Sequence, residues 1–371
     1  MGKRRIFSDE VGRSIPRRVV KCPGKEGGHV DSLGALQQLV PELAEVLERR
    51  YGLLKMIQSE APVGRRFIAA KLGSSERVVR GELDVLREQG LVASSSLGVR
   101  LSLQGEKVLM VLQAMIREFR DFGYLEHRLA QALGVGKMII VPGDVDSNAS
   151  GQRDLADATA RYLKEVLKDG DVLAVSGGST LARVAESVSG QDLPKDITVV
   201  PVRGGLGEDA RIHANSIAVS LAENLRGSYR QLHAPEGVSP CYLQQIINEP
   251  RIREVIALGR RANVLVHGIG TAEEMAKRRG FDDASLMELI AEGAVGEAFG
   301  CYFDKHGDIV RNTTSVGLRL EDLERIPLVI TVGGGRSKAW AVLSVLSRGY
   351  CDVCITDEGV ARRLMSIKEI T

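Results

Sequence analysis

The stretch from Asp171 to Ser189, DVLAVSGGSTLARVAESVS, constrains the fold of this chain more than any other part of the sequence. Its first half contains the apolar run VLAV, which is typical of a buried strand, whereas its second half repeats apolar residues at helical spacing. The period changes at the segment SGGST, residues 176–180. A strand that turns directly into a helix is the unit from which parallel α/β sheets are built, so the stretch predicts that architecture.

The glycine turn SGGST has the composition of a phosphate-binding loop. A strand-to-helix turn presents free backbone N–H groups and the positive end of the helix dipole, and its glycines let an anion approach the backbone. The candidate contacts are Gly177, Gly178, Ser179 and Thr180, the last two adding hydroxyl donors. The alternative is an ordinary tight turn in which Ser179 caps the helix. The segment is neither a Walker loop nor a full dinucleotide fingerprint.

From Gly134 onward, expected strands alternate with expected helices. This alternation predicts a Rossmann-like domain over residues 135–371, with a parallel sheet covered by helices on both faces. Strands are expected at 137–142, 171–175, 197–202, 263–267, 328–331 and 353–356, and helices at 155–167, 181–188 and about 210–225.

Four further glycine-bearing segments follow strands or precede helices in this domain: 201–207 (PVRGGLG), 267–271 (HGIGT), the expected turn 293–300 (GAVGEAFG) and 331–338 (TVGGGRSK). Ligands bind at the carboxyl ends of the strands in open α/β sheets, so we expect these loops to converge with SGGST on one site. Besides the SGGST residues, the candidates are Arg203, Gly204, His213, Gly268, Gly270, Glu297 and Lys338.

The charged candidates suggest the kind of ligand. Arg203 and Lys338 place two cations beside glycine-freed backbone N–H groups, an arrangement that suits two separate anionic groups. Glu297 is placed to accept hydrogen bonds from sugar hydroxyls, and His213 to reach a phosphate or a hydroxyl. For each residue alone, a surface ion pair or an ordinary helix cap is the competing interpretation.

Residues 36–103 have the pattern of a helix-turn-helix domain. Helices dominate from 33 to 60, where Pro41 suits the first turn of a helix. A short helix at 63–72, with Ile68, Ala69 and Leu72 facing inward, is followed by the turn Gly73-Ser74-Ser75 and a longer helix at 76–88. This order of elements is typical of helix-turn-helix proteins that bind double-stranded DNA.

The helix at 76–88 is the candidate recognition helix. Ser74 or Ser75 can cap it. Arg77 and Arg80 project from its first turns, from which recognition helices contact base edges in the major groove. Its expected apolar positions are Val78, Val79, Leu83, Val85 and Leu86.

The segment after Gly90, LVASSSLGVRLSLQGEKVL, predicts two strands joined by a Ser/Gly turn, which would make the unit a winged helix. Arg100 on the second strand is placed for a backbone phosphate of DNA. A three-helix bundle without DNA contact is the alternative. The ordered set of short helix, capped helix and hairpin favours operator DNA as a partner.

Charge is divided unevenly along the chain. Residues 1–120 contain 21 Lys+Arg and 14 Asp+Glu, a net charge of +7. Residues 121–371 contain the remaining 29 Lys+Arg and 34 Asp+Glu, a net charge of −5. Residues 1–35 are interpreted as a basic flexible arm that could contact phosphates, or as a plain leader. Residues 104–134 are expected to form a linker helix whose apolar residues also suit self-association.

Composition excludes several other classes of protein. The chain has 44% apolar and 26% charged residues, and it contains no apolar run of the roughly 20 residues that span a bilayer and no signal-peptide core. A cytoplasmic globular protein without membrane partners is therefore expected. The five cysteines are scattered, and Cys351 and Cys354 form a C-x-x-C without a second ligand pair, so neither a disulfide framework nor a metal site is predicted.

The segments VSGGSTLARVAE, VPVRGGLGED, HGIGTA, GAVGEAFGCYF and VGGGRSKA, in this order after a winged-helix segment, resemble the sugar-phosphate-responsive regulators of the SorC type. The resemblance covers about residues 40–371. It implies a repressor, assembled as a dimer or tetramer, whose C-terminal domain resembles sugar-phosphate isomerases and deaminases and binds a phosphorylated sugar, which is fructose-1,6-bisphosphate in the most similar members of the family. Ser179 stands where relatives often have threonine, and His213 where a similar member of the family has glutamine.

Two functions follow from the sequence. The leading hypothesis is a DNA-binding repressor that is not an enzyme, uses no cofactor and responds to a sugar phosphate. The rival is a sugar-phosphate isomerase or deaminase with an appended helix-turn-helix, which would use Glu297 as a base and Lys338 as electrostatic support. Against the rival, only His213 and His267 among the six histidines lie in the candidate loops.

Overall fold

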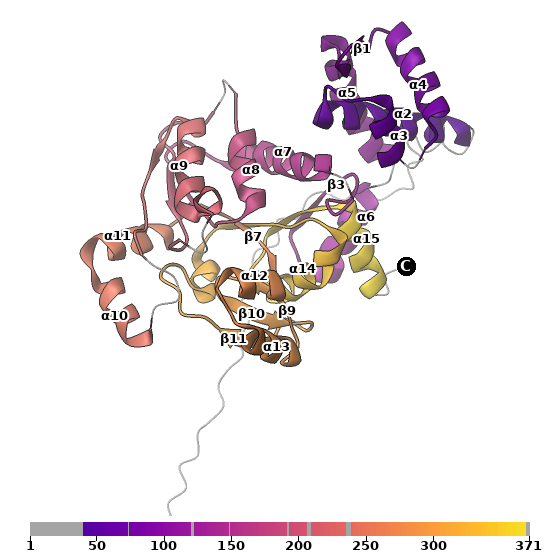
Figure 1. Ribbon diagram of the computed structural model, residues 1–371. Helices are drawn as coiled ribbons and strands as arrows, with labels where there is room; N and C mark the ends of the chain where they lie inside the picture. The colour runs from indigo at the N-terminus through magenta and orange to yellow at the C-terminus, as the bar shows by residue number, and fades with distance from the viewer. Residues whose placement is uncertain are drawn as a thin grey trace, which may run out of the picture.

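The computed structural model describes residues 40–72, 74–119, 122–147, 149–190, 193–205, 209–234 and 239–368. Within them the chain forms a small helical domain and a larger α/β domain (Figure 1). The expected basic arm, residues 1–35, and Gly73 of the predicted turn lie outside the described residues. No helix in the described ranges is long and apolar enough to cross a membrane.

The small domain packs four helices against a two-stranded hairpin. Pro41 occupies the first turn of the first of them, where its missing N–H removes no helical hydrogen bond. The elements are α2 (Pro41–Glu60), α3 (Arg65–Lys71), α4 (Glu76–Glu88), β1 (Val92–Ser95), β2 (Gly98–Leu101) and α5 (Leu103–Phe119). The predicted helix-turn-helix and the predicted hairpin are both confirmed, and β1 pairs antiparallel to β2.

Two positions expected inside the small domain are exposed. Leu72 is 37% exposed, because it lies just beyond the end of α3, where the chain leaves the helix. Val78 is 45% exposed, because it is one residue, or about 100° of helix rotation, away from the buried Val79. The remaining core joins α2, α3, α4 and the hairpin to Leu109 of α5.

The segment expected to be one linker helix contains two helices. Helix α5 ends at Phe119 and α6 runs over Phe122–Leu133. Each helix belongs to a different core: Leu109 packs in the small domain, whereas Phe122 and Leu129 pack in the α/β domain. The hydrophobic pattern is continuous along the sequence, but it serves two separate domains.

The α/β domain is built on a parallel seven-stranded sheet in the order β3-β13-β12-β7-β4-β5-β6. The strands are β3 (Lys137–Val141), β4 (Val172–Val175), β5 (Thr198–Pro201), β6 (Ser228–Tyr229), β7 (Val264–Gly268), β12 (Leu328–Val332) and β13 (Val353–Asp357). Every strand predicted from the sequence is present, and the short edge strand β6 is an addition. The predicted parallel sheet is therefore confirmed.

Helices cover both faces of this sheet, as predicted. Helices α7 (Ala149–Val166), α8 (Ser179–Ser187) and α9 (Ala214–Leu225) share one apolar core with the sheet, whereas α6, α14 (Ala339–Leu346) and α15 (Glu358–Ile367) share the other. Helices α10 (Pro240–Asn248) and α11 (Pro250–Gly259) form a smaller cluster at the side.

A second, antiparallel sheet was not predicted. It has the order β11-β10-β9-β8 and carries α12 (Ala272–Arg278) and α13 (Asp283–Ala291). Its strands are β8 (Gly270–Thr271), β9 (Ala294–Ala298), β10 (Cys301–Asp304) and β11 (Ile309–Asn312). The segment 293–300, expected to be a glycine-rich turn, is thus mostly strand β9, because residues 294–298 pair with β8 and β10.

The order of the large sheet creates a switch point between β4 and β7. From β4 the chain continues outward through β5 and β6, and then returns to β7 on the other side of β4. The loops after β4 and β7 therefore leave the sheet side by side and diverge, which opens a crevice at the carboxyl ends of the strands.

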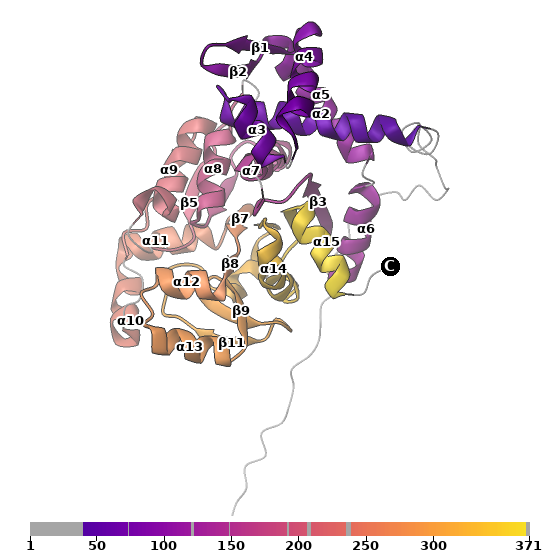
Figure 2. The same cartoon turned by 45° about the vertical axis from the view of Figure 1, so that its right-hand side comes forward.

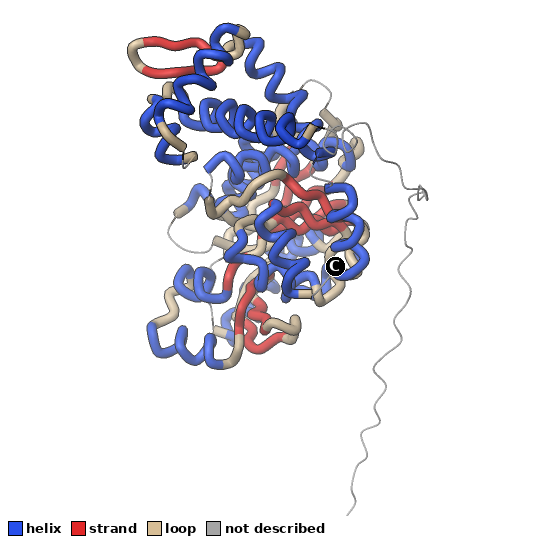
Figure 3. Tube along the Cα trace, turned by 90° about the vertical axis from the view of Figure 1, so that its right-hand side faces the viewer, coloured by secondary structure: helices blue, strands red, loops and turns tan. Residues whose placement is uncertain are grey.

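The two domains meet through α2 and α7. Figure 2 shows α2 lying against α7, with α4 and the β-hairpin on the side of the small domain away from the sheet. Lys55 of α2 and Asp154 of α7 form an ion pair in this contact, and the Lys55 residue is only 4% exposed. Figure 3 shows the small domain, the large sheet and the small sheet following one another along the molecule.

Candidate ligand pocket and nucleic-acid interface

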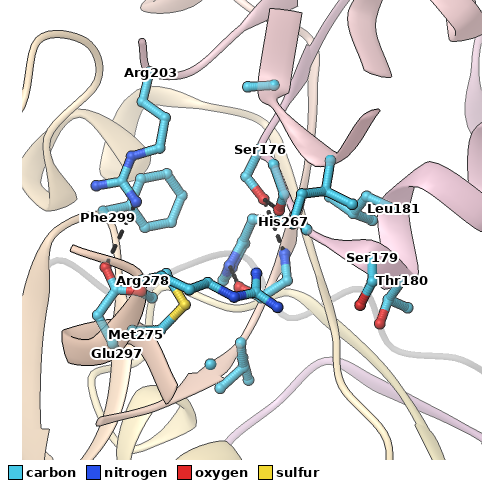
Figure 4. Close-up of a pocket in the computed structure, with 18 of the residues that line it drawn as sticks. Ser176, Ser179, Thr180, Leu181, Arg203, His267, Met275, Arg278, Glu297 and Phe299 are labelled. Atoms are coloured by element: carbon cyan, nitrogen blue, oxygen red, sulfur yellow. Dashed lines mark hydrogen bonds and ion pairs between the residues drawn. The ribbon is translucent and has the colours of Figure 1, made fainter. Parts of the chain in front are cut away.

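A pocket lies at the switch point, between the loops that follow β4, β5 and β7 (Figure 4). All of the ligand-site residues predicted from the sequence line it: Gly177, Gly178, Ser179, Thr180, Arg203, Gly204, His213, Gly268, Gly270, Glu297 and Lys338. The glycine-bearing segments therefore converge on one pocket, as expected. The small sheet contributes the wall that carries Glu297.

The two glycines of SGGST are required by the backbone. Gly178 is the N-cap of α8 with φ 129°, in a region that disfavours other residues, and a Cβ on Gly177 would lie 2.8 Å from the carbonyl oxygen of Ile212. The interpretation of Ser179 as N-cap is wrong, because Ser179 is the first residue of the helix. Ser179 and Thr180 therefore lie on the first turn of α8, whose N–H groups lack intrahelical acceptors.

Ser176 joins the two loops of the switch point. Its hydroxyl accepts a hydrogen bond from the N–H of Gly268 over 3.1 Å and donates to the carbonyl oxygen of Gly177 over 3.1 Å. This bridge fixes the loop after β4 against the loop after β7. The floor of the pocket is consequently held in place by the protein itself.

Glu297 is a buried ion-pair partner in the wall of the pocket. Its Oε1 lies 2.8 Å from Arg279 Nη2 and 3.6 Å from Arg203 Nη1, and it accepts a 2.7 Å hydrogen bond from the N–H of Gly300. Burial alone would raise the pKa of this carboxyl, but the charges of Arg279 and Arg203 and the two hydrogen bonds together lower it. Glu297 is therefore held ionised.

Arg203 lies deep in the pocket wall and is only 8% exposed. Besides its pairing with Glu297, its Nη2 lies 3.5 Å from the hydroxyl of Ser315, and its backbone forms an isolated bridge to Gly317. Arg203 therefore lines the pocket and forms an ion pair, but that pair is buried rather than on the surface as the competing interpretation had it. Its guanidinium faces Glu297 and Phe299 in Figure 4.

Lys338 also lines the pocket, and it lies at the end of a short 3-10 turn that precedes α14. Carboxylates from the loop after β3 hold this turn: Asp144 accepts from the N–H of Arg336, and Asp146 accepts from the N–H of Ser337. The ammonium group of Lys338 lies 3.2 Å from Glu274 Oε2, and Glu274 Oε1 accepts a 2.7 Å hydrogen bond from Arg278.

The two histidines of the candidate loops have different environments. His267 is a buried residue of β7, where Nε2 lies 2.8 Å from the Thr331 hydroxyl and Nδ1 lies 3.1 Å from the carbonyl oxygen of Gly268. Burial lowers its pKa to about 4, which keeps the imidazole neutral near pH 7. His213 is the N-cap residue of α9, but its side chain makes no cap hydrogen bond.

Sequence reasoning missed Ser176, Glu274, Met275, Arg278 and Phe299 as lining residues. Three of them lie on α12 in the charged run AEEMAKRR, which has the composition of a solvated surface helix. The usable signal was Thr271, the last residue of HGIGT, which caps α12 by accepting from the N–H of Glu274 and so fixes this helix at the pocket.

The candidate DNA-binding residues lie on the exposed side of the small domain. Ser75 is the N-cap of α4 and accepts a hydrogen bond from the N–H of Val78, whereas Ser74 makes no such cap. Arg77 and Arg80 are exposed on α4, and Arg100 is exposed on β2. A capped helix with outward arginines beside a β-hairpin presents the elements that a winged helix applies to a DNA groove and backbone.

Neither the histidines nor the cysteines form a metal centre in the described parts of the chain, where no group of three or more His, Cys, Asp or Glu is arranged to hold an ion. Cys351 and Cys354 are free and buried, and burial raises the pKa of both thiols. A buried thiol that stays protonated is a poor nucleophile and a poor metal ligand.

Comparisons with known proteins agree for both domains. Residues 117–366 match the family described as a sugar-binding domain, and residues 46–116 match the family described as the CggR N-terminal DNA-binding domain. The chain is 38% identical over 331 residues to the central glycolytic genes regulator of Bacillus subtilis, covering 89% of this chain and 97% of that protein.

Solved structures support the fold. A chain described as a SorC family transcriptional regulator from Enterococcus faecalis is 35% identical with a TM-score of 0.61, covering 65% of this chain and 99% of that one. The full-length sorbitol operon regulator SorC from Klebsiella pneumoniae is 18% identical with a TM-score of 0.60, covering 86% of this chain and 98% of that one, and shows the shared fold of both domains.

Proposed function

This chain belongs to the SorC-type family of sugar-binding transcriptional regulators, and we propose on that basis that it represses glycolytic or sugar-catabolic genes. We further propose that a phosphorylated sugar controls its binding to operator DNA. One observation carries the proposal. Segments distant in sequence, each glycine-bearing, meet in a single pocket at the switch point of the sheet, and that pocket is lined by cations and by the first turn of α8.

The ligand that fits this pocket best is a sugar bisphosphate, with fructose-1,6-bisphosphate as the leading candidate. The first turn of α8, with Ser179 and Thr180, offers donors to one phosphate, and Lys338 or Arg203 offers charge to another. Glu297 and His213 are proposed to contact the sugar hydroxyls or phosphate oxygens that lie between the two phosphate positions. Two anionic ends on one ligand would use cationic sites at two loops at once.

The pocket favours binding over chemistry. A base must accept a proton near pH 7, but the two guanidinium groups beside Glu297 lower the pKa of its carboxyl. His267 has hydrogen-bonding partners for both ring nitrogens inside the protein. An isomerase or deaminase reaction would therefore lack its proton-transfer groups at these two positions.

Calorimetric titration of the full chain with fructose-1,6-bisphosphate and with fructose 6-phosphate tests the ligand. We expect the bisphosphate to bind roughly tenfold to a hundredfold more tightly, since a charge-assisted contact contributes about 1.5–3 kcal/mol. Thr180→Ala and Lys338→Ala should weaken binding, whereas Lys277→Ala, which removes an exposed lysine of α12 outside the pocket, should not. Equal affinity for both sugars would refute the bisphosphate, and product formation during the titration would favour the enzyme.

Binding to the DNA upstream of its own coding sequence tests the regulator. We expect the bisphosphate to weaken or remodel the complex and the K338A protein to bind DNA normally but respond only at higher ligand concentration. The salt dependence of the affinity should reflect the phosphate contacts of the small domain. An affinity for DNA that is indifferent to every phosphorylated sugar would contradict the proposal.

A homo-oligomer, either a dimer or a tetramer, is part of the proposal, as is a cytoplasmic location. Helix α5 supports self-association because Leu103, Met110 and Val111 are 81%, 65% and 62% exposed. Light scattering of the full chain, with and without the bisphosphate, would measure the assembly. A monomer at every concentration would contradict this part.

A further inference from the structure

Glu274 holds the two cations of the pocket that are nearest to solvent. It is the only carboxylate besides Glu297 among the residues that line the described pocket. Each of its oxygens has a different partner: Oε2 lies 3.2 Å from Lys338 Nζ, and Oε1 lies 2.7 Å from Arg278 Nη2. One negative charge thus bridges a cation from the loop after β12 and a cation from α12.

The backbone of Glu274 is held by a helix cap, whereas its side chain is partly exposed to water. The Thr271 hydroxyl accepts a hydrogen bond from the N–H of Glu274 in the first turn of α12. The side chains of Glu274, Lys338 and Arg278 are 37%, 28% and 31% exposed. Ion pairs this open to water contribute little, so they can be exchanged at low cost.

Glu297 has the opposite character in the same pocket. Its side chain and that of Arg279 are 4% and 6% exposed, so breaking their pair would leave two charges buried. In Figure 4 the guanidinium of Arg278 extends from the side of Met275 and Glu297 toward Ser179 and Thr180. The Arg278 guanidinium, one partner of the exposed ion pairs, therefore points toward the donors of α8.

We propose that Glu274 is an internal competitor of the ligand: its carboxylate neutralises Lys338 and Arg278 until a phosphate group displaces it. The proposal rests on the proposed function, because it names how the same pocket selects its ligand. A phosphate monoester carries nearly two negative charges near pH 7 and a carboxylate only one, so exchange favours the phosphate. Once phosphate is bound, Glu274 faces a like charge and must turn away. Glu274 thereby sets the threshold concentration of the effector and rejects ligands with weaker anionic ends.

Removing the competitor should tighten binding. In Glu274→Gln the two cations keep their positions but lose their counterion, and we expect the affinity of the full chain for fructose-1,6-bisphosphate to rise about tenfold at low salt. Because the pairs are partly exposed, the gain should shrink as salt is raised toward about 0.5 M. Inorganic phosphate, as a minimal probe, should show a gain in the same direction.

The neighbouring residue provides a matched control. Glu273 lies on the same helix, pairs with Lys277 over 2.6 Å and does not line the pocket. Glu273→Gln changes the net charge of the protein identically, so it should leave the affinity within about twofold of the parent. In the double variant Glu274→Gln, Lys338→Gln the gain should be largely lost, since one of the released cations is gone.

Titration calorimetry of these four proteins decides the matter. A parent that binds the bisphosphate, with E274Q binding equally or more weakly, overturns the competitor and leaves the proposed function standing. An equal gain in E273Q would reduce the effect to overall charge and would also overturn it. Failure of the parent and of E274Q to bind either probe would sink both proposals. A gain for E274Q with no effect of the bisphosphate on DNA binding would support the competitor and refute the regulator.

Discussion

Each domain contains a buried glutamate between two arginines, and the two triads differ in how far water reaches them. Glu82 of α4 pairs with Arg49 and Arg50, each over 2.8 Å, but the side chains of these arginines are 45% and 32% exposed. Glu297 pairs with Arg279 and Arg203, whose side chains are 6% and 10% exposed. Water can replace the partners of the first glutamate but not those of the second.

This difference in solvent exposure matches the two kinds of ligand proposed for the two domains. DNA is a long, convex, highly charged ligand, so the small domain can present its arginines on flexible side chains in solvent. A small anion such as the proposed sugar phosphate must be surrounded, so a pocket for it needs charges whose positions are fixed before the ligand arrives. Buried ion pairs provide that fixation, and they make the pocket sensitive to changes that the small domain tolerates.

Removal of each glutamate should destabilise its own domain, and the loss should be much larger in the α/β domain than in the small domain. Glu297→Ala leaves two buried guanidinium groups without a counterion and should destabilise the α/β domain by about 3–5 kcal/mol. Glu82→Ala should cost about 1 kcal/mol or less per exposed pair in the small domain. Hydrogen exchange, followed separately in peptides from β9 and from α4, measures both. Similar losses in the two domains would show that exposure does not distinguish the triads.

Acid should affect the domains differently. The pKa of His267 falls from 6.5 to about 4 on folding, so the unfolded chain binds the extra proton between these values and stability decreases as pH drops from about 6.5 to 4. The loss for the α/β domain should approach about 3 kcal/mol. Residues 40–119 contain no histidine, so the small domain should change little until the pH approaches the range in which carboxylates titrate, where the lowered pKa of Glu82 adds a loss of its own. A denaturation series on the parent and on His267→Gln checks this, because the variant should lose the slope.

Substitution of the exposed arginines should change binding without changing stability. Arg77→Ala and Arg80→Ala should each weaken binding to operator DNA by about 1–3 kcal/mol if they contact base edges, and should relax the preference for sequence. Ligand affinity of the pocket should stay at the parental value. Fluorescence anisotropy with operator and with scrambled DNA, at matched salt, measures both effects. Parental binding by both variants would exclude α4 as the recognition helix.

The smallest expected effect concerns the helix cap. Ser75→Ala removes the acceptor for the N–H of Val78 and should destabilise the small domain by about 1 kcal/mol. Ser74→Ala is the matched control, because Ser74 lies one residue earlier and is not the cap. Thermal unfolding of each intact variant, followed by hydrogen exchange in the peptides that cover α4, distinguishes the two substitutions. Equal effects would place the start of the recognition helix elsewhere.

The sequence predicted what depends on local periodicity and missed what depends on contacts across the fold. The bounds of α4 and the strands of the large sheet follow from apolar spacing and glycine turns, and the convergence of their loops follows from the rule for parallel sheets. Arg279 and Glu274 could not be found in this way, because their roles arise only when α12 is placed against β9 and the loop after β12.

The remaining errors also arose from tertiary context. Glu297 was expected in a turn, since its segment is rich in glycine, but pairing with β8 and β10 extends that segment into a strand. The continuous helical pattern of residues 104–134 concealed two helices, because periodicity does not reveal which core a helix faces.

The position of β3 at the edge of the large sheet has a consequence for the order of events during synthesis. Residues 137–141 pair along their length with residues 353–357, so the first strand of the α/β domain meets its partner only when nearly the whole chain has left the ribosome. The small domain, whose core closes within residues 51–109, can fold much earlier. The nascent protein would therefore form its DNA-binding domain before its sugar-binding domain, and Lys55 would face water until Asp154 reaches it.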